Sequence, residues 1–197
     1  GIIFDFKTPD NFFTKIYVNI IGLHNLKNVL SALSIIDQIK EIEISELLPF
    51  LSDLKGIERR MDIYKIDDKI IIDDYAHHPT EIESVFNTIN SNYKNKSTSV
   101  IFQPHLFSRT RDFMEDFATV LSKFDEVYLL DVYPAREKPI EGVNSKVLLE
   151  KISSAKKEII NKELINDIII NSKAEVISIL GAGNITENLN KKIFTND

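Results

Sequence analysis

The sequence contains no cysteine and no tryptophan, and only six glycines and six prolines. The absence of cysteine excludes disulfides, thiolate zinc sites and a cysteine nucleophile. The low glycine and proline content excludes collagen-like and low-complexity chains. No apolar run reaches the roughly 18 residues that a membrane span needs, and residues 1–20 lack the pattern of a signal peptide. We therefore expect a cytoplasmic protein with no membrane partner.

Charge and hydrophobic content exclude further classes of protein. The 30 acidic residues outnumber the 24 basic ones, and the net charge of −6 argues against a nucleic-acid partner. With 43% hydrophobic residues, the chain can bury a core, so it is not disordered. A length of 197 residues fits one full domain plus part of another.

Arginine and histidine are scarce and clustered. Arginine presents a rigid fork of donors that suits carboxylate and phosphate, which makes its few positions candidates for recognition. These positions are Arg59, Arg60, Arg109, Arg111 and Arg136. The histidines fall in three short stretches, as His24, as the pair His77 and His78, and as His105. This clustering indicates functional sites.

The first 60 residues predict a small mixed segment. Strands are predicted over 2–6 and 15–21, with a turn over 8–11 between them. Helical spacing of apolar residues follows over 25–38, and a second helix over 45–54 ends at Gly56. Two strands and a helix make a poor core. We therefore interpret residues 1–38 as the end of a larger domain and residues 39–56 as a linker and helix.

Residues 57–197 alternate between strands and helices. Strands are predicted over 61–66, 70–74, 99–103, 126–130 and 175–180, and helices over 79–92, 110–123, 144–153, 162–171 and 184–194. This alternation predicts an α/β fold with a mostly parallel sheet and helices on both faces. Polar residues follow the strand ends, where open α/β sheets bind ligands. They include Asp73, Asp74, His77, His105 and Asp131.

Two short motifs in the first part of the chain could bind a ligand. Asn25 and Asn28 lie one turn apart at a predicted helix start, so both amides can face one ligand or simply cap the helix. Arg59 and Arg60 follow Gly56. They could clamp phosphate or ribose, or form a solvated charge pair.

Two denser motifs follow strand ends. The run from Asp73 to Glu81 holds two carboxylates and two imidazoles, which can bind a metal or orient a polar substrate, or leave one histidine structural. In the run from Phe102 to Asp112, His105 and Arg109 could share a pocket with His77. Arg111 and Asp112 are the better candidates for a surface ion pair.

Three nucleotide or hydrolase signatures are missing or incomplete. The glycines Gly181 and Gly183 lack the third glycine of a dinucleotide fingerprint, so a tight turn is the better interpretation. No Walker loop of the type Gly-x4-Gly-Lys-Ser/Thr and no Gly-x-Ser-x-Gly elbow occurs. The sequence given therefore has neither a phosphate cradle nor a nucleophile of these kinds.

Taken in order, six motifs resemble the Mur ligases over essentially the whole chain. They are Gly22-x-His24-Asn25-x-x-Asn28, Gly56-x-x-Arg59-Arg60, the run Asp73 to Glu81, Phe102-Gln103-Pro104-His105 through Asp112, Asp131-Val-Tyr133-Pro134-Ala-Arg136-Glu137, and Gly181-Ala-Gly183-Asn184. Each motif is weak alone, and their shared order makes the resemblance specific.

The resemblance implies a three-domain ligase. Residues 1–38 would end its central ATPase domain, and residues 57–197 would form its Rossmann-like C-terminal domain. The N-terminal and central domains, with the Walker loop, would precede Gly1. ATP and Mg²⁺ would activate the muramoyl carboxylate of UDP-N-acetylmuramate as an acyl phosphate, which L-alanine attacks. The Gln103-Pro104-His105 stretch favours alanine over a murein tripeptide, and the isolated chain would be inactive.

The resemblance also implies residue roles. The nucleotide would be held by Asn25 and Asn28 at the adenine and by Arg60 and Asp74 at the ribose and phosphates. The substrates would contact Tyr75, His77, His105 and Arg109, of which His77, His105 and Arg109 are the catalytic candidates. One departure is Leu106, where the family often has arginine; Arg109 or Arg136 would then replace that contact.

Two other functions fit the composition. A metal-dependent phosphoesterase could use carboxylate and imidazole ligands, and it would bind metal tightly as this chain alone. Its ligands would come from Asp73, Asp74, His77, His78 and His105. A nucleotide-binding module without chemistry is the third interpretation. The ligase interpretation predicts no metal binding by this chain alone.

Overall fold

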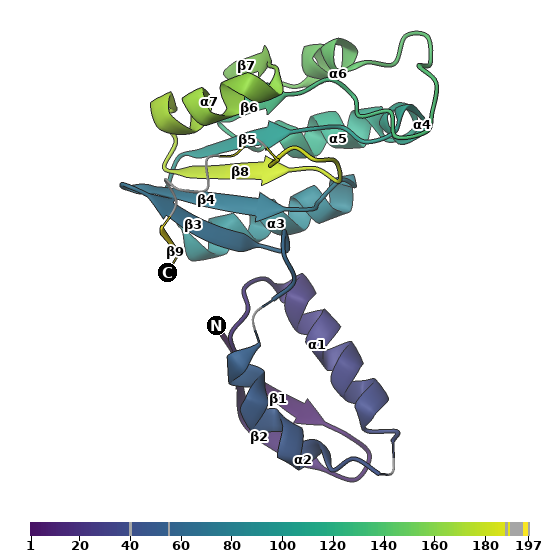
Figure 1. Ribbon diagram of the computed structural model, residues 1–197, viewed down its shortest axis with the longest axis vertical. Helices are drawn as coiled ribbons and strands as arrows, with labels where there is room; N and C mark the ends of the chain where they lie inside the picture. Colours follow the sequence, from purple (N-terminus) through teal and green to yellow (C-terminus); the bar gives the residue numbers. More distant parts are fainter. Residues whose placement is uncertain (40, 55, 188, 190–194, 197) are drawn as a thin grey trace. The chain divides into compact units, whose positions relative to one another are not determined.

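The computed structural model describes residues 1–39, 41–54, 56–187, 189 and 195–196. The chain divides into two compact units, Gly1–Arg60 and Met61–Asp197, which are taken separately here (Figure 1). In the described residues, no helix is long and apolar enough to cross a membrane.

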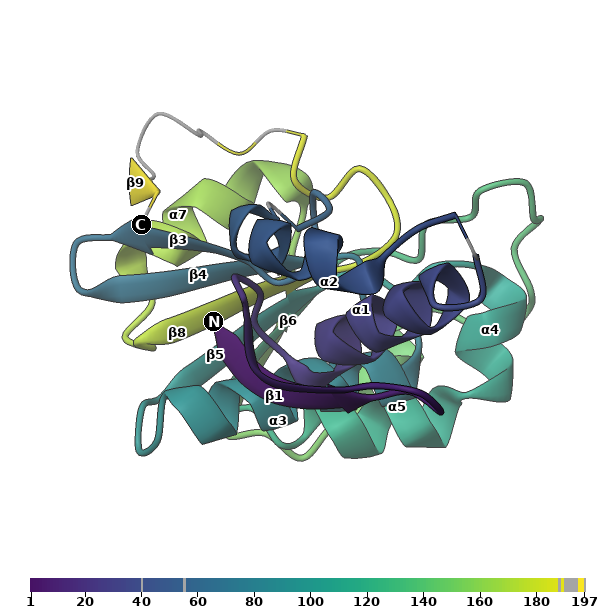
Figure 2. The same cartoon turned by 90° about the horizontal axis from the view of Figure 1, so that it is seen from below.

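The first unit is a hairpin covered by helices. Strands β1 (Ile2–Lys7) and β2 (Phe12–Val18) pair antiparallel. Helix α1 (Leu23–Ile36), the short helix α2 (Ile44–Leu47) and the 3-10 helix η1 (Leu48–Asp53) follow (Figure 2). Their shared core consists of Phe6, Ile16, Val18, Leu33, Ile44 and Leu51. The predicted second helix thus forms as two pieces, because Pro49 lies in its first 3-10 turn and has no N–H to continue an α-helix.

The second unit is built on one large sheet. Its strands are β3 (Asp62–Ile66), β4 (Lys69–Asp74), β5 (Thr98–Phe102), β6 (Glu126–Leu129), β7 (Lys156–Ile159), β8 (Val176–Leu180) and β9 (Thr195–Asn196), in the order β7-β6-β5-β8-β4-β3-β9. Strands β4 to β8 pair parallel, whereas β3 is antiparallel to β4 and to β9. The predicted mostly parallel sheet is therefore confirmed.

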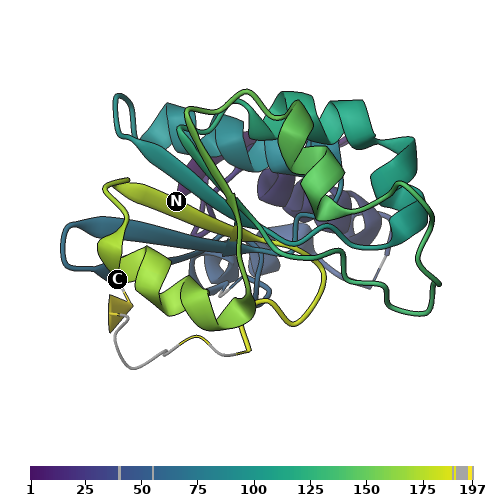
Figure 3. The ribbon, with the colours of Figure 1, turned by 90° about the horizontal axis from the view of Figure 1, so that it is seen from above.

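Helices cover both faces of this sheet. They are α3 (Pro79–Asn92), α4 (Phe107–Asp112), α5 (Met114–Leu121), α6 (Ser145–Lys151), the 3-10 helix η2 (Lys162–Leu164) and α7 (Ile165–Asn171). Figure 3 shows α7 on one face and α3 and α5 on the other. Side chains alternate along each strand. Ile101 thus packs in the cluster that includes Ile165 and Ile169 of α7, while the Phe102 ring lies 5.4 Å from the Phe117 ring of α5.

Other predicted helices also differ from the structure, and one strand was not predicted. The helix predicted over 110–123 breaks at Phe113 into α4 and α5. Strand β7 was not predicted from the sequence, because its first three residues are exposed and no apolar alternation marks it. Residues 184–187 of the predicted last helix form bends and turns, and 188 and 190–194 lie outside the described residues.

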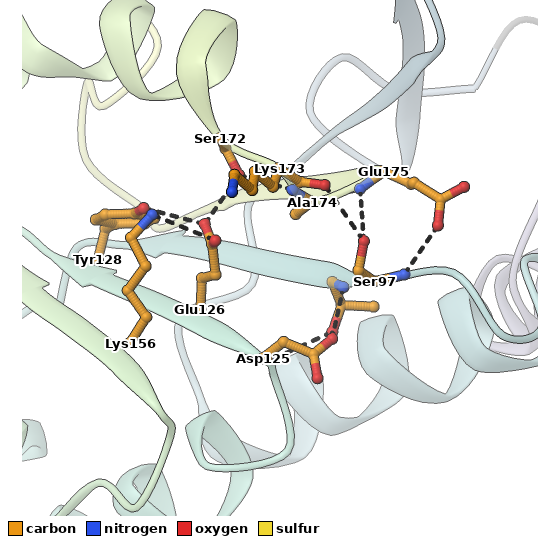
Figure 4. A network of polar contacts seen from close by, with 10 residues as sticks. Ser97, Asp125, Glu126, Tyr128, Lys156, Ser172, Lys173, Ala174 and Glu175 are labelled. Carbon is orange, nitrogen blue, oxygen red and sulfur yellow. Dashed lines mark hydrogen bonds and ion pairs between the residues drawn. The ribbon is translucent and has the colours of Figure 1, made fainter.

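The amino edge of the parallel sheet carries a closed polar network (Figure 4). The Glu126 carboxylate accepts hydrogen bonds from the Ser172 hydroxyl at 2.9 Å, the Tyr128 hydroxyl at 3.0 Å and the Lys156 ammonium at 3.2 Å. Burial alone would raise the pKa of Glu126, but these three donors lower it below its usual value. Because these groups satisfy one another, we interpret this edge as structural.

Candidate functional site

The carboxyl ends of four parallel strands meet at one edge of the sheet. There the Gln103 N–H donates to the Leu180 carbonyl at 3.0 Å and the Leu130 N–H to the Phe102 carbonyl at 3.0 Å. The Gly181 N–H donates to the Asp74 carbonyl at 3.3 Å. The loops that follow β4, β5, β6 and β8 are thereby neighbours, as expected where the carboxyl ends of parallel strands meet.

Aromatic and imidazole rings from three of these loops form a row. The His77 ring centroid lies 6.0 Å from that of His105 and 5.4 Å from that of Tyr75. On its other side, His105 stacks on Tyr133, with centroids 5.4 Å apart and an interplanar angle of 14°. The structure thus brings together Tyr75, His77 and His105, which are 30 residues apart at most.

His105 and Arg109 each keep a buried nitrogen without a partner. In the part of the chain that the structure describes, neither Nδ1 of His105 nor Nη1 of Arg109 has a hydrogen-bond partner. The pKa of His105 is lowered by burial first, then by the positive charges of Arg109 and His77, against the opposing effect of Glu137. The unpaired Nη1 of Arg109 is a donor on a permanent cation, which suits a ligand anion, because a buried donor left unpaired is costly. The His105 ring can donate to the same anion through whichever of its nitrogens carries the proton.

His77 is oriented by its own loop. Its Nδ1 lies 2.9 Å from the Tyr75 carbonyl oxygen, which can only accept, and its backbone N–H donates to Glu81 at 2.9 Å. We therefore assign the proton of the neutral ring to Nδ1, which leaves Nε2 as an acceptor. The ring is only partly exposed.

His78 is the structural member of the histidine pair. Its Nδ1 accepts from the Thr80 N–H at 3.4 Å, and its own N–H donates to the Glu81 carboxylate at 3.1 Å. These two bonds form a capping box at the start of α3, and Pro79 occupies its first turn. The surface pair predicted for Arg111 and Asp112 is also present, at 2.8 Å.

Asp74 is buried and bonded to backbone groups. The residue is only 5% exposed. Its Oδ2 accepts a hydrogen bond from the Met61 N–H at 2.9 Å, and its Oδ1 accepts one from the Ala76 N–H at 2.8 Å. The carboxylate therefore holds the start of β3 and the loop after β4 in place. Within the residues described, no group of three or more His, Asp or Glu side chains could hold a metal, so the phosphoesterase interpretation is not favoured.

The remaining candidates belong to the first unit. Gly22, at φ 94°, is the N-cap of α1 and has no side chain to cap with, so neither asparagine caps the helix. The Asn25 amide donates to the Ile21 carbonyl at 2.9 Å and to the Arg60 carbonyl at 3.5 Å. Asn28 and the side chain of Arg60 are exposed. Asn25 and Arg60 are thus neighbours within this unit.

The two glycines after β8 are required by close packing. A Cβ on Gly181, where φ is 150°, would lie 3.1 Å from the Gln103 carbonyl oxygen. A Cβ on Gly183 would lie 2.9 Å from Gln103 Oε1 and 3.3 Å from the Tyr133 ring. Both glycines thus permit close packing against the loops after β5 and β6, while the chain after β8 continues in bends and turns through residue 187 rather than in the predicted helix.

Three residues of this edge were not among the predicted site residues. Tyr133 stacks on His105, and Glu137 accepts two hydrogen bonds from Ser108. The sequence signal for Tyr133 and Glu137 was their place after a predicted strand. Nothing in the sequence pairs either of them with a particular residue of the loop after β5.

The sequence matches a known protein family. Residues 59–183 match the family model described as Mur ligase, glutamate ligase domain. This chain therefore belongs to the Mur ligase family, as its motifs indicated.

Individual relatives are similar over nearly the whole chain. A UDP-N-acetylmuramate–L-alanine ligase of Christiangramia forsetii is 48% identical over 191 residues, which is 96% of this chain and 42% of the relative. One of Flavobacterium psychrophilum is 44% identical over 186 residues, or 94% of this chain and 41% of the relative. The chain thus spans about two fifths of the length of these relatives.

Solved structures are similar as well. The crystal structure of a UDP-N-acetylmuramate-alanine ligase from Thermotoga maritima matches with a TM-score of 0.68 and 26% identity, over 86% of this chain and 37% of that one. A folylpolyglutamate synthase from the same organism matches with a TM-score of 0.65 at 19% identity, over 97% of this chain and 45% of that one. The second likeness shows the fold alone.

Proposed function

We propose that this chain is the C-terminal part of an ATP-dependent ligase that joins L-alanine to the muramoyl carboxylate of UDP-N-acetylmuramate. The observation that carries the proposal is the 48% identity over 96% of the chain to a UDP-N-acetylmuramate–L-alanine ligase. The unpartnered nitrogens of His105 and Arg109 support it, because both substrates carry carboxylates.

In this proposal the second unit binds and orients the substrates. Arg109 and His105 hold a substrate carboxylate, and Tyr75 lines the same row of rings. The Nε2 lone pair of His77 is available to take a proton from the attacking amine. Placing amine and carboxylate in reacting geometry lowers the barrier chiefly by orientation.

For the nucleotide, the proposal keeps the residues that the resemblance implies. Asn25 and Asn28 would face the adenine, and Arg60 would face the ribose and phosphates. When bound, ATP supplies the phosphoryl group that activates the carboxylate, with Mg²⁺ offsetting its charge. The backbone bonds of Asp74 support a role in holding the loop that carries Tyr75 and His77, beside any ribose contact.

The proposal assigns domains as follows. Residues 1–38 end the central ATPase domain, residues 39–56 are a linker and helix, and residues 57–197 are the C-terminal domain. The rest of the central domain and an N-terminal domain belong to the same cytoplasmic protein. No nucleic-acid partner is proposed.

The proposal is tested with the complete protein that carries this chain. We expect it to form UDP-N-acetylmuramoyl-L-alanine and to release ADP and phosphate, in a reaction that requires both substrates. The 197-residue chain alone should not turn over ATP, because its sequence contains no Walker loop. Preference for a murein tripeptide over L-alanine would assign the protein to another ligase of the family. Metal-dependent ester hydrolysis by the chain alone would overturn the proposal.

A further inference from the structure

Ser108, which lies between His105 and Arg109, is bonded to a side chain from another loop. The Glu137 carboxylate accepts from the Ser108 backbone N–H at 2.9 Å and from its hydroxyl at 2.5 Å. Glu137 comes from the loop after β6, 29 residues further along the chain. Its two bonds therefore tie that loop to the first turn of α4, one residue before Arg109.

The same segment is held at its other end by backbone bonds. The Tyr133 N–H donates to the Pro104 carbonyl at 2.8 Å, and the Leu106 N–H donates to the Tyr133 carbonyl at 2.9 Å. Leu106 has φ 74°, a conformation that a residue with a side chain rarely adopts. Such a conformation persists only where the surrounding contacts impose it. The backbone bonds of Tyr133 on one side of Leu106, and the bonds from Ser108 to Glu137 on the other, provide these contacts.

The charge of Glu137 lies near Arg109 without pairing with it. The pKa of Glu137 is lowered first by the Ser108 hydroxyl and backbone N–H, and to a smaller extent by the positive charge of Arg109. Among the described residues, Nη1 of Arg109 has no hydrogen-bond partner. The Glu137 carboxylate is thus bonded to Ser108 and not to the guanidinium.

We propose that Glu137 is a positioning residue, which through Ser108 fixes the start of α4 so that Arg109 remains available to a substrate carboxylate. This inference rests on the proposed ligase function. The carboxylate comes either from L-alanine or from the muramoyl group, and the two sources are distinguished by which KM changes.

The test uses Glu137→Gln in the complete protein, with Glu141→Gln as the matched control. Glu141 is an exposed residue of the same connection, so its change removes the same charge without touching Ser108. For Glu137→Gln we expect the KM of one carboxylate substrate to rise by about tenfold, the order that follows from losing one charge-assisted hydrogen bond. The KM of ATP should stay at the wild-type value. A general loss of folding would instead lower kcat in proportion to the folded fraction.

Ser108 supplies a second, independent arm. Ser108→Ala should raise the same KM, and Ser108→Thr, which keeps both donors, should raise it less. In the Glu137→Gln background, Ser108→Ala should have little further effect, because both changes remove one interaction. Additive effects of the two changes would overturn the inference. If Glu137→Gln does not fold, the single variants Ser108→Ala and Ser108→Thr still test it, and an unchanged KM in Ser108→Ala would overturn it.

The outcomes separate the two proposals. If the wild-type protein ligates and Glu137→Gln behaves like Glu141→Gln, the positioning role is wrong and the ligase function stands. If the wild-type protein does not ligate L-alanine, both are overturned. A raised KM for L-alanine assigns the carboxylate to the amino acid, and a raised KM for UDP-N-acetylmuramate assigns it to the muramoyl group.

Discussion

Replacing Asp74 by asparagine tests how the loop that carries Tyr75 and His77 is held. The two carboxylate oxygens accept from the Met61 and Ala76 backbone N–H groups at 2.9 and 2.8 Å, in a residue that is 5% exposed. Asparagine keeps one acceptor oxygen and places an NH₂ group where the other was. Whichever way the amide turns, one buried backbone N–H loses its acceptor.

The expected cost follows from these two bonds. A hydrogen bond to a charged group contributes about 1.5–3 kcal/mol, and a buried donor left unpaired costs about 1–3 kcal/mol. Because these figures overlap, we expect the free energy of unfolding of the second unit to fall by about 2–4 kcal/mol. That corresponds to a decrease in Tm of roughly 6–12 °C, at about 3 °C per kcal/mol.

Urea unfolding of the 197-residue chain, followed by circular dichroism, measures this cost. Because the chain has two units, the curve is fitted with two transitions, and the change should be confined to one of them. The control is Asp68→Asn, the same chemical change at an exposed turn between β3 and β4, which should alter stability by no more than about 0.5 kcal/mol. Equal stability of the two variants would refute the structural role. Wild-type stability with a raised KM for ATP in the complete protein would instead favour a direct ribose contact.

Three further predictions concern the rings and loops at the carboxyl edge. Arg109→Lys keeps the charge but loses the planar fork, so kcat/KM for ligation by the complete protein should fall by at least about tenfold, and near-normal ligation would show that Arg109 is only a charge at a helix start. Burial, Arg109 and His77 lower the pKa of His105 below 6.5 in the folded chain. As the pH falls, the unfolded chain therefore binds a proton at this imidazole before the folded chain does, so the free energy of unfolding should rise with pH in the range just below 6.5. The His105→Gln variant should lack this part of the slope, and identical urea midpoints against pH in both proteins would contradict it. Gly183→Ala would place a Cβ 2.9 Å from Gln103 Oε1 and 3.3 Å from the Tyr133 ring, so thermal unfolding should show a loss of about 1–3 kcal/mol, whereas an unchanged Tm would mean that these side chains move aside freely.

The sequence predicted the strands that have a hydrophobic signal. The cores of β4, β5 and β6 are apolar runs bounded by polar residues, and β8 is apolar except for Ser178; this pattern is sufficient for a buried parallel strand. Strand β7 has no such signal, because it lies at the edge of the sheet and its first three side chains are exposed. Its place depends on pairing with β6, which is a contact between distant parts of the chain. The break at Phe113 is likewise not marked by any glycine or proline within the predicted helix.

For the candidate site, the sequence predicted which residues would gather, and the tertiary structure determined which of them interact. The residue types around His77, His105 and Arg109, and their places after strands, followed from the sequence, because parallel strands bring their carboxyl ends to one edge. The individual partners did not follow from it. His78 caps α3, whereas His77, one residue earlier, joins the row of rings because the order of strands in the sheet brings His105 beside it.

Ser108 and Glu137 show the same limit most clearly. Each is an ordinary polar residue in its own segment, and 29 residues separate them. Only the pairing of β5 with β6 places their loops side by side. Short-range preferences encode which segments become strands and helices, whereas contacts between loops depend on sheet order and register. The availability of Arg109 was therefore decided by the tertiary structure alone.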